Sequence, residues 1–274
     1  MNHNVYIPQL AKIIQIKEEV TGARPIKTFR TQFLNGYNFS FRCGQCAMLS
    51  VFGKGESMIS ISSTPLIKDY LQFSILKMGR VTSALHEMLE GEIIGIRGPY
   101  GNGFPIEDWK GKNLIFIGGG IGLPPIWSVL QTVLRKKEEY GQLTLIYGAR
   151  TSKDLVFKEE LKDLKKKITV HLSIDVEEPD WQEFVGFVPQ NVLDKKPSPA
   201  KAISVTCGPP IMIKFVIKAL KELGFEDEQI YTTVENKMKC GIGKCGRCNI
   251  GSHYVCKDGP VYSWAELKKL PQEY

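Results

Sequence analysis

The chain has 274 residues, enough for about two domains and more than one hydrophobic core. Hydrophobic residues make up 43% and charged residues 24%, which excludes a disordered, collagen-like or disulfide-dense chain. The net charge of +7 suits an acidic partner, but no aromatic-basic interleaving indicates nucleic acid. No stretch approaches 18 apolar residues, and residues 1–4 do not resemble the start of a secretory leader. We therefore expect a cytoplasmic protein without a transmembrane segment.

Residues 1–106 are mostly short β-rich runs separated by turn residues, and residues 53–56 have the composition of a hairpin connection. One helix is expected over 82–89, capped by Thr82 or Ser83. Several short strands with a single helix predict an antiparallel β-barrel domain. The expected strands are 26–33, 46–52, 58–63, 70–76 and 92–97.

Residues 107–224 alternate between strands and helices, which predicts an α/β domain with a mostly parallel sheet. The expected strands are 113–117, 143–147, 168–174 and 202–206, and the expected helices are 124–139, 155–165 and 210–223. Residues 225–274 form a third region, with a strand expected over 229–235, a cysteine cluster, and an amphipathic tail over 263–270.

The cysteine cluster is the most specific motif in the chain. Cys240, Cys245 and Cys248 have the spacing C-x4-C-x2-C, and Cys256 follows after seven residues. This is the spacing of a plant-type 2Fe–2S loop. The intervening glycines permit the positive φ angles that let backbone N–H groups approach the sulfurs. The alternative is a structural zinc site, which normally uses two well-separated cysteine pairs.

A second motif is the glycine turn at 118–122, between an apolar strand and a helix. Such a turn can hold a nucleotide diphosphate, because the helix N-terminus supplies N–H donors and a positive dipole end. A tight turn without a ligand is the alternative interpretation. Cys207 and Gly208 follow another strand of the same sheet and are expected at the same crevice, although Cys207 could equally be an ordinary buried cysteine.

Hydroxyl side chains at 58–64 and around the helix start at 79–85 could hydrogen-bond a flavin, although exposed serine and threonine are common on strands. The pair Cys43 and Cys46 has C-x-x-C spacing. A redox dithiol would need a helix N-terminus, whereas this segment is expected to enter a strand. We therefore interpret Cys43 and Cys46 as incidental.

The order of these motifs resembles the ferredoxin–NADP reductase superfamily over nearly the whole chain. More narrowly, it is similar to the iron–sulfur flavoprotein subunits of three enzymes: soluble nickel–iron hydrogenases (the gamma subunit of sulfhydrogenases), anaerobic sulfite reductase, and dihydroorotate dehydrogenase. The short spacing between Cys248 and Cys256 favours the first two. The motifs that carry the resemblance are residues 59–63, 79–85, 98–104, 118–122, 207–212, 238–248 and 254–260.

The resemblance implies an FAD-binding barrel (1–106), an NAD(P)-binding domain (107–224) and a 2Fe–2S module (225–274). It places the flavin ring along Ile59, Ser60, Ile61 and Ser62. It places the FAD pyrophosphate at Gly79, Arg80, Val81, Thr82 and Ser83, with Arg80 replacing the arginine that the family has at the position of Ser57. It places the NAD(P)H pyrophosphate at Gly118, Gly119, Gly120 and Gly122, and the nicotinamide beside Cys207 and Gly208. The cluster ligands it implies are Cys240, Cys245, Cys248 and Cys256.

These parts imply an oxidoreductase that passes electrons between NAD(P)H, FAD and a 2Fe–2S cluster, because only a flavin exchanges both electron pairs and single electrons. No terminal catalytic centre is evident, so we expect partner subunits, first of all those of a hydrogenase. Anaerobic sulfite reductase, a dihydroorotate dehydrogenase complex and a free-standing NAD(P)H:ferredoxin reductase are alternatives. From a different class, the chain could be a zinc-bearing nucleotide-binding adaptor without redox activity.

Overall fold

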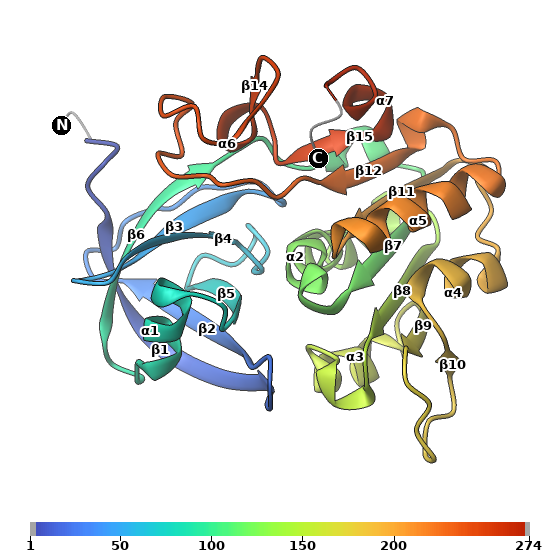
Figure 1. Ribbon diagram of the computed structural model, residues 1–274, viewed down its shortest axis with the longest axis horizontal. Helices are drawn as coiled ribbons and strands as arrows, with labels where there is room; N and C mark the ends of the chain where they lie inside the picture. Colours follow the sequence, from blue (N-terminus) through green and yellow to red (C-terminus); the bar gives the residue numbers. More distant parts are fainter. Residues whose placement is uncertain (1–3, 272–274) are drawn as a thin grey trace.

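The computed structural model describes residues 4–271 and contains two units side by side, with a C-terminal module lying across them (Figure 1). The first unit is a six-stranded antiparallel sheet in the order β4-β3-β6-β1-β2-β5. It closes on itself where Ser62 N–H donates to the Gln72 carbonyl, at 2.8 Å. Its elements are β1 (Gln9–Val20), β2 (Ile26–Phe33), β3 (Cys46–Val51), β4 (Gly55–Ser60), β5 (Leu71–Leu76), α1 (Arg80–Glu87) and β6 (Ile93–Tyr100).

The second unit is a seven-stranded sheet in the order β10-β9-β8-β7-β11-β12-β15, parallel except for the β12–β15 pair. Its strands are β7 (Asn113–Gly119), β8 (Leu143–Ala149), β9 (Thr169–Ile174), β10 (Phe184–Val185), β11 (Ala202–Cys207) and β12 (Ile230–Thr233). Its helices are α2 (Leu123–Leu134), α3 (Lys158–Leu164), α4 (Val188–Lys195) and α5 (Pro210–Glu222).

The C-terminal module contains β13 (Asn249–Ile250), β14 (His253–Tyr254), α6 (Val255–Asp258), β15 (Val261–Ser263) and α7 (Trp264–Leu267). Strand β15 completes the second sheet by pairing with β12, so the module is anchored to the α/β unit through main-chain hydrogen bonds. Short 3₁₀ turns occur at Ile106–Trp109, Gly120–Gly122, Lys137–Glu139, Ser152–Asp154 and Asp227–Gln229.

The structure differs from the expected elements at several places. Strand β1 lies at the centre of the first sheet, although its charged stretch at residues 17–19 and its two register shifts hide the alternating pattern of a strand. Helix α4 has no counterpart among the expected elements. Helix α1 begins at Arg80, and its N-cap is Gly79 rather than Thr82 or Ser83. Helices α2 and α3 are shorter than expected, since α2 ends at Leu134 and α3 begins only at Lys158.

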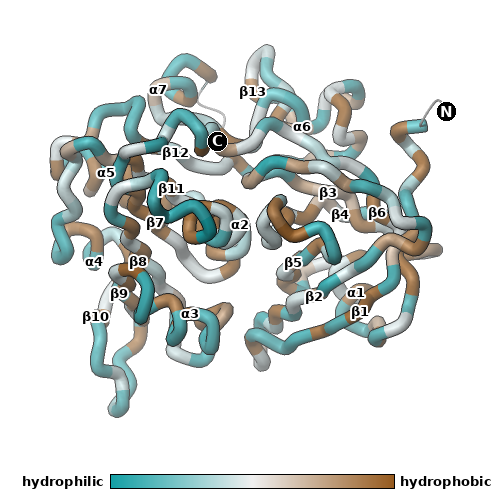
Figure 2. The backbone as a smooth tube through the Cα atoms, turned by 180° about the vertical axis from the view of Figure 1, so that it is seen from behind, coloured by the Kyte–Doolittle hydropathy of each residue, from teal (hydrophilic) through white to brown (hydrophobic). Residues whose placement is uncertain are grey.

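Buried hydroxyl groups join the two units along helix α2, the hydrophobic helix that lies between them in Figure 2. Ser128 Oγ donates to the Ser63 carbonyl at 2.6 Å. The Thr132 hydroxyl lies 2.7 Å from the Thr64 hydroxyl and 3.1 Å from the Cys43 thiol. All of these side chains are buried. The contact between the two units therefore contains buried hydrogen bonds in addition to apolar packing.

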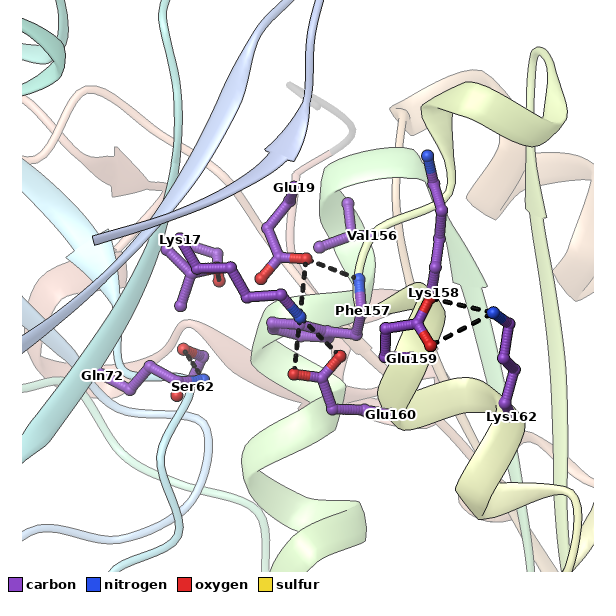
Figure 3. A network of polar contacts seen from close by, with 12 residues as sticks. Lys17, Glu19, Ser62, Gln72, Val156, Phe157, Lys158, Glu159, Glu160 and Lys162 are labelled. Carbon is purple, nitrogen blue, oxygen red and sulfur yellow. Dashed lines mark hydrogen bonds and ion pairs between the residues drawn. The ribbon is translucent and has the colours of Figure 1, made fainter. Parts of the chain in front are cut away.

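A second contact joins β1 to the start of α3 (Figure 3). Lys17 Nζ lies 2.8 Å from Glu160 and 3.5 Å from Glu19. Glu19 accepts a hydrogen bond from the backbone N–H of Phe157 at 3.1 Å. No helix within residues 4–271 combines the length and the apolar character that crossing a bilayer requires.

Candidate functional site

The loop that carries the cysteine motif folds around its own sulfur atoms. Gly241, Gly243 and Gly246 have φ angles of +81°, +69° and +69°, which side-chain-bearing residues rarely adopt. The backbone N–H groups of residues 242, 244 and 245 lie 3.5, 3.3 and 3.4 Å from Cys240 Sγ. Gly243 N–H lies 3.2 Å from Cys256 Sγ. Such N–H groups stabilise thiolates, as a metal cluster requires.

The four cysteines of the motif lie near one another, because Cys245 affects the pKa of Cys240, and both Cys248 and Cys240 affect the pKa of Cys256. Burial alone would raise the pKa of Cys240, but the three backbone N–H groups lower it to about 6. Burial raises the pKa of Cys256 to about 12. Cys248 and Cys256 are buried, whereas Cys245 is exposed at the edge of the loop. Among residues 4–271, no three His, Cys, Asp or Glu side chains converge as a site for one metal ion.

Arg97 on β6 attaches this loop to the barrel. Its guanidinium donates to the carbonyls of Cys240 at 2.8 Å and Lys239 at 3.2 Å. The same group pairs with Glu56 at 2.7 Å, and this hydrogen bond holds the pKa of the Glu56 carboxyl below its ordinary value. Gly241 packs against the ring of Tyr100, so closely that a Cβ there would lie 2.8 Å from it. The loop is therefore held by barrel side chains far away in sequence.

Residues 98–104 provide the second attachment. The Asn102 side chain donates to the carbonyls of Asp258 and Val261 at 3.0 and 2.7 Å, and it accepts from Val261 N–H at 3.0 Å. Gly101 N–H donates to the Cys256 carbonyl at 2.9 Å. In the sequence this segment stands out only as part of a resemblance, and the roles of Arg97 and Asn102 were missed. One sequence signal could have indicated Asn102: it lies between two glycines, and asparagine side chains in such turns often hydrogen-bond to backbone groups.

The glycine turn at the end of β7 lies against the end of β11, as expected. A Cβ on Gly122 would lie 2.3 Å from the Cys207 carbonyl oxygen and 2.6 Å from Gly208 Cα. A Cβ on Gly119 would lie 2.3 Å from Met212 Sδ. Gly118 packs on the Tyr147 ring, whereas a Cβ on Gly120 would meet no atom within 4 Å. Residues 118–122 and 207–208 thus form one compact feature that is open at Gly120.

The predicted flavin residues lie at the end of β4 and directly after it, and they differ in burial. Ile59 and Ser60 are half-buried, whereas Ile61 and Ser62 are buried. The Ser62 hydroxyl accepts from the Gln72 side chain at 3.3 Å, so it takes part in barrel packing (Figure 3). The Ser60 hydroxyl lies 3.7 Å from Cys46 Sγ, at the half-buried end of the strand.

The predicted phosphate residues form the first turn of α1. Gly79 and Arg80 are exposed, and residues 81–83 are half-buried. The Thr82 hydroxyl accepts from the backbone N–H groups of Met78 and Gly79 at 3.0 and 2.9 Å, which satisfies donors of the turn. Arg80 donates to the Gly53 carbonyl at 3.1 Å and so ties the helix start to the β3–β4 hairpin.

Cys46 lies between two of the predicted sites. In the barrel register it is paired with Ser60 on β4 and with Tyr100 on β6. Burial raises the pKa of Cys46 to about 11 and that of Cys207 to about 12. Thr233 donates to Cys207 Sγ at 2.9 Å. Cys43 instead faces α2, so the members of the C-x-x-C pair have different neighbours.

Comparisons with known proteins agree with this geometry. Residues 116–218 match the oxidoreductase NAD-binding domain family, and residues 235–268 match the iron–sulfur cluster binding domain of dihydroorotate dehydrogenase B. Sulfhydrogenase 1 subunit gamma of Pyrococcus furiosus is 37% identical, covering 98% of this chain and 95% of its own. Sulfhydrogenase 2 subunit gamma of that organism is 38% identical over 95% and 96% of the two chains. A probable dihydroorotate dehydrogenase B electron transfer subunit from that organism is 33% identical over 93% and 91%.

Solved structures agree on the fold. An NADH-dependent reduced ferredoxin-NADP oxidoreductase structure superimposes with a TM-score of 0.75 at 22% identity, covering 100% of this chain and 95% of the other. Ferredoxin-NADP+ reductase from Plasmodium falciparum gives a TM-score of 0.69 at 19% identity, over 85% and 98% of the chains. The expected fold class, an antiparallel barrel with a parallel α/β domain and an iron–sulfur module, is confirmed.

The fold is shared with ferredoxin-NADP reductases, and the matched domains define an oxidoreductase with an NAD-binding domain and a C-terminal iron–sulfur cluster binding domain. More narrowly, the chain belongs to the family of the sulfhydrogenase gamma subunits. The expectation of an electron-transfer protein of this class is confirmed by these relatives.

Proposed function

We propose that this chain passes electrons from NAD(P)H through FAD to a 2Fe–2S cluster, or in reverse, on behalf of a partner redox subunit. The observation that carries the proposal is the position of Cys46. It is paired with Ser60 on the predicted flavin strand and with Tyr100, whose ring contacts the cluster loop at Gly241. The predicted flavin strand and the cysteine loop are therefore both adjacent to Cys46, and the glycine turn packs on Cys207 and Gly208 in the neighbouring unit, which supports a relay across the contact between the units.

For the flavin, the proposed ring contacts are Ile59, Ser60, Ile61 and Ser62, of which Ile59 and Ser60 are the less buried. The first turn of α1 would receive the phosphates, because the start of a helix presents N–H donors and a positive dipole end. Arg80 would supply the positive charge there, since it is exposed and is held at the helix start by Gly53. Gly79, Val81, Thr82 and Ser83 complete this turn.

For the dinucleotide, residues 118–122 would approach the pyrophosphate at the carboxyl edge of the sheet, the position where ligands bind in open α/β sheets. Cys207 and Gly208 would lie beside the nicotinamide. The Cys207 thiol remains protonated at neutral pH, because burial raises its pKa to about 12. Cys207 would therefore act as a neutral packing surface and not as a thiolate.

For the metal centre, the 2Fe–2S type is supported by the C-x4-C-x2-C spacing of Cys240, Cys245 and Cys248, with Cys256 seven residues later. A structural zinc site would normally use two well-separated cysteine pairs. The backbone N–H groups aimed at Cys240 and Cys256 are suited to cluster sulfurs. When bound, the flavin would take two electrons from the nicotinamide and release them singly to the cluster.

For the partner, the sulfhydrogenase relatives favour the other subunits of a hydrogenase, with a dihydroorotate dehydrogenase complex as the second candidate because of the 33% identical relative. Electrons would leave near Cys245, the exposed cysteine of the loop. Exposed basic residues surround it, namely Lys237, Lys239, Lys244, Arg247 and Lys257. An acidic partner surface would fit them, and a cytoplasmic location suits a chain whose thiols must stay reduced.

The experiment that tests the function is an anaerobic titration of the purified protein with NADH and, separately, NADPH. Flavin reduction is followed by visible absorption and cluster reduction by EPR. Flavin bleaching together with a rhombic 2Fe–2S signal supports the proposal and ranks the two nucleotides. A colourless protein that contains zinc and no iron would overturn it.

A further inference from the structure

The glycine turn is held from inside the α/β unit by Tyr147 on β8. The Tyr147 hydroxyl donates to the Gly120 carbonyl at 3.0 Å and accepts from the backbone N–H of Val156, also at 3.0 Å. The side chain is fully buried, and burial raises its pKa, so the hydroxyl keeps its proton as a donor. Both of its hydrogen bonds are made to backbone.

The Gly120 carbonyl accepts from the Tyr147 hydroxyl and from the backbone N–H of Leu123, and these two bonds orient one peptide group. In a planar trans peptide, the carbonyl of Gly120 and the N–H of Ile121 point in opposite directions. Because the carbonyl is directed inward to Tyr147, the Ile121 N–H is directed away from it. Gly120 itself has a φ of +53° and open space where a Cβ would be. An N–H presented at the open side of a helix start is a donor for an anionic oxygen.

The segment that contacts Tyr147 is in turn held by the barrel. Phe157 follows Val156 and has a φ of +59°, a strained conformation for a residue with a large side chain. Its N–H donates to Glu19 on β1, which is only 8% exposed. Lys17 lies between Glu19 and Glu160 and forms an ion pair with each, so the start of α3 is also attached to β1 by charged side chains (Figure 3).

We propose that Tyr147 is a positioning residue for the dinucleotide, and that Glu19 of the barrel supports it by fixing residues 156–157. Tyr147 keeps the Ile121 N–H oriented toward the pyrophosphate, and Glu19 makes the geometry of this turn depend on the docking of the two units. The inference rests on the proposed binding of NAD(P)H at this turn. It adds Tyr147 and Glu19 as residues that set the affinity of the turn for the dinucleotide.

The test is the binding of ADP-ribose, which carries the pyrophosphate but undergoes no electron transfer, measured by calorimetry on the cofactor-loaded protein. Tyr147→Phe removes one buried hydroxyl and is expected to weaken binding about fivefold, the usual effect of one hydrogen bond. The KM for the preferred nucleotide rises by the same factor, while kcat stays unchanged. Hydrogen exchange in the peptide covering residues 118–123 becomes faster.

The matched control is Tyr140→Phe, because the Tyr140 hydroxyl also donates to a backbone carbonyl, that of Ile106, away from the glycine turn. It should leave ADP-ribose binding and exchange at 118–123 unchanged. Equal weakening in Tyr140→Phe, or unchanged binding in Tyr147→Phe, overturns the proposal. If the unmodified protein binds neither NADH nor NADPH, the proposed function fails instead.

The barrel contribution is tested with Glu19→Leu, which removes the acceptor of the Phe157 N–H, and Glu19→Gln, which retains an oxygen there. The leucine variant should weaken ADP-ribose binding about twofold to threefold, and the glutamine variant should restore most of it. In the Tyr147→Phe background, Glu19→Leu should weaken ADP-ribose binding little further, because Glu19 acts on the turn only through residues 156–157 and Tyr147. Full additivity of the two changes would overturn the link to Glu19.

Discussion

The glycine turn at 118–122 and the cysteine loop at 240–248 use the same local chemistry but are supported in different ways. Both combine glycines with backbone N–H groups, which lie near sulfur atoms in the cysteine loop and are proposed to meet a pyrophosphate in the glycine turn. The glycine turn is formed by close backbone packing within one sheet, where Gly122 touches the Cys207 carbonyl. The cysteine loop depends on side chains of another unit, chiefly Arg97 and Asn102.

This difference suits the ligands proposed for the two loops. A dinucleotide would enter and leave, so its turn would have to keep its shape without the ligand, and contacts within the sheet provide that. A resident cluster would supply four bonds of its own, so its loop would need outside contacts mainly for placement relative to the barrel. Mutations in the cysteine loop should therefore act mainly on metal content, and mutations in the glycine turn on stability and dinucleotide binding.

The largest effect is expected at the cysteine loop itself. Cys248→Ser removes a buried ligand, and the variant should lose its cluster iron and its EPR signal entirely, while NAD(P)H still bleaches the flavin. Metal analysis and EPR provide the measurement. Cys43→Ser is the matched control, because this buried thiol contacts α2 and should leave the iron content unchanged. Retention of the full signal in Cys248→Ser would refute the ligand assignment.

The glycine turn should respond to a single added methyl group. In Gly122→Ala the Cβ would lie 2.3 Å from the Cys207 carbonyl oxygen, and the backbone must separate. We expect a loss of about 1–3 kcal/mol in urea-unfolding free energy, together with loss of ADP-ribose binding. Gly111→Ala is the control, since it adds only left-handed strain of about 1 kcal/mol in open space and should leave binding intact. Normal stability and binding in Gly122→Ala would contradict the packing described.

The smallest effect concerns the ion pair that attaches the cysteine loop. Arg97 lowers the folded-state pKa of Glu56 below 4.5, so its stabilisation is present above that pH and is lost as the pH falls through the lowered pKa. Glu56→Gln should unfold more easily by less than about 1 kcal/mol at pH 7, and the difference should vanish in acid.

Urea midpoints measured between pH 7 and pH 3 test this dependence. Glu159→Gln is the control, because Glu159 pairs with Lys162 on an exposed helix face and should give no such pH-dependent difference. A difference between Glu56→Gln and the unmodified protein that grows as the pH falls would reverse the expected sign.

The sequence predicted those parts of the molecule whose chemistry is local. The cysteine spacing and the glycine turn are contiguous motifs, and each has the expected position. The strand β1 could not be recognised, because its Lys17 and Glu19 serve contacts with α3 and so break the alternation of a strand. The expected helix over 155–165 begins later for a related reason: Phe157 leaves helical geometry and donates its N–H to Glu19.

The attachments of the cysteine loop were unpredictable for a different reason. Arg97 and Asn102 act on carbonyl groups, which every residue carries, so no side-chain pattern in residues 235–261 identifies their partners. The hydroxyl of Ser62 shows the opposite case, in which a residue in a matching motif serves barrel packing through Gln72. Spacing indicates chemistry within a segment, but pairing between distant segments depends on the fold.

The hydrogen bonds of Asn102 have a consequence for the order of events during synthesis. Its partners Asp258 and Val261 lie 156 and 159 residues further along the chain. Most barrel and sheet residues leave the ribosome before the loop that closes over both. Loading of the proposed cluster should therefore wait until residues 240–261 have been translated, and a nascent protein released before them would lack that centre even if both larger units had already folded.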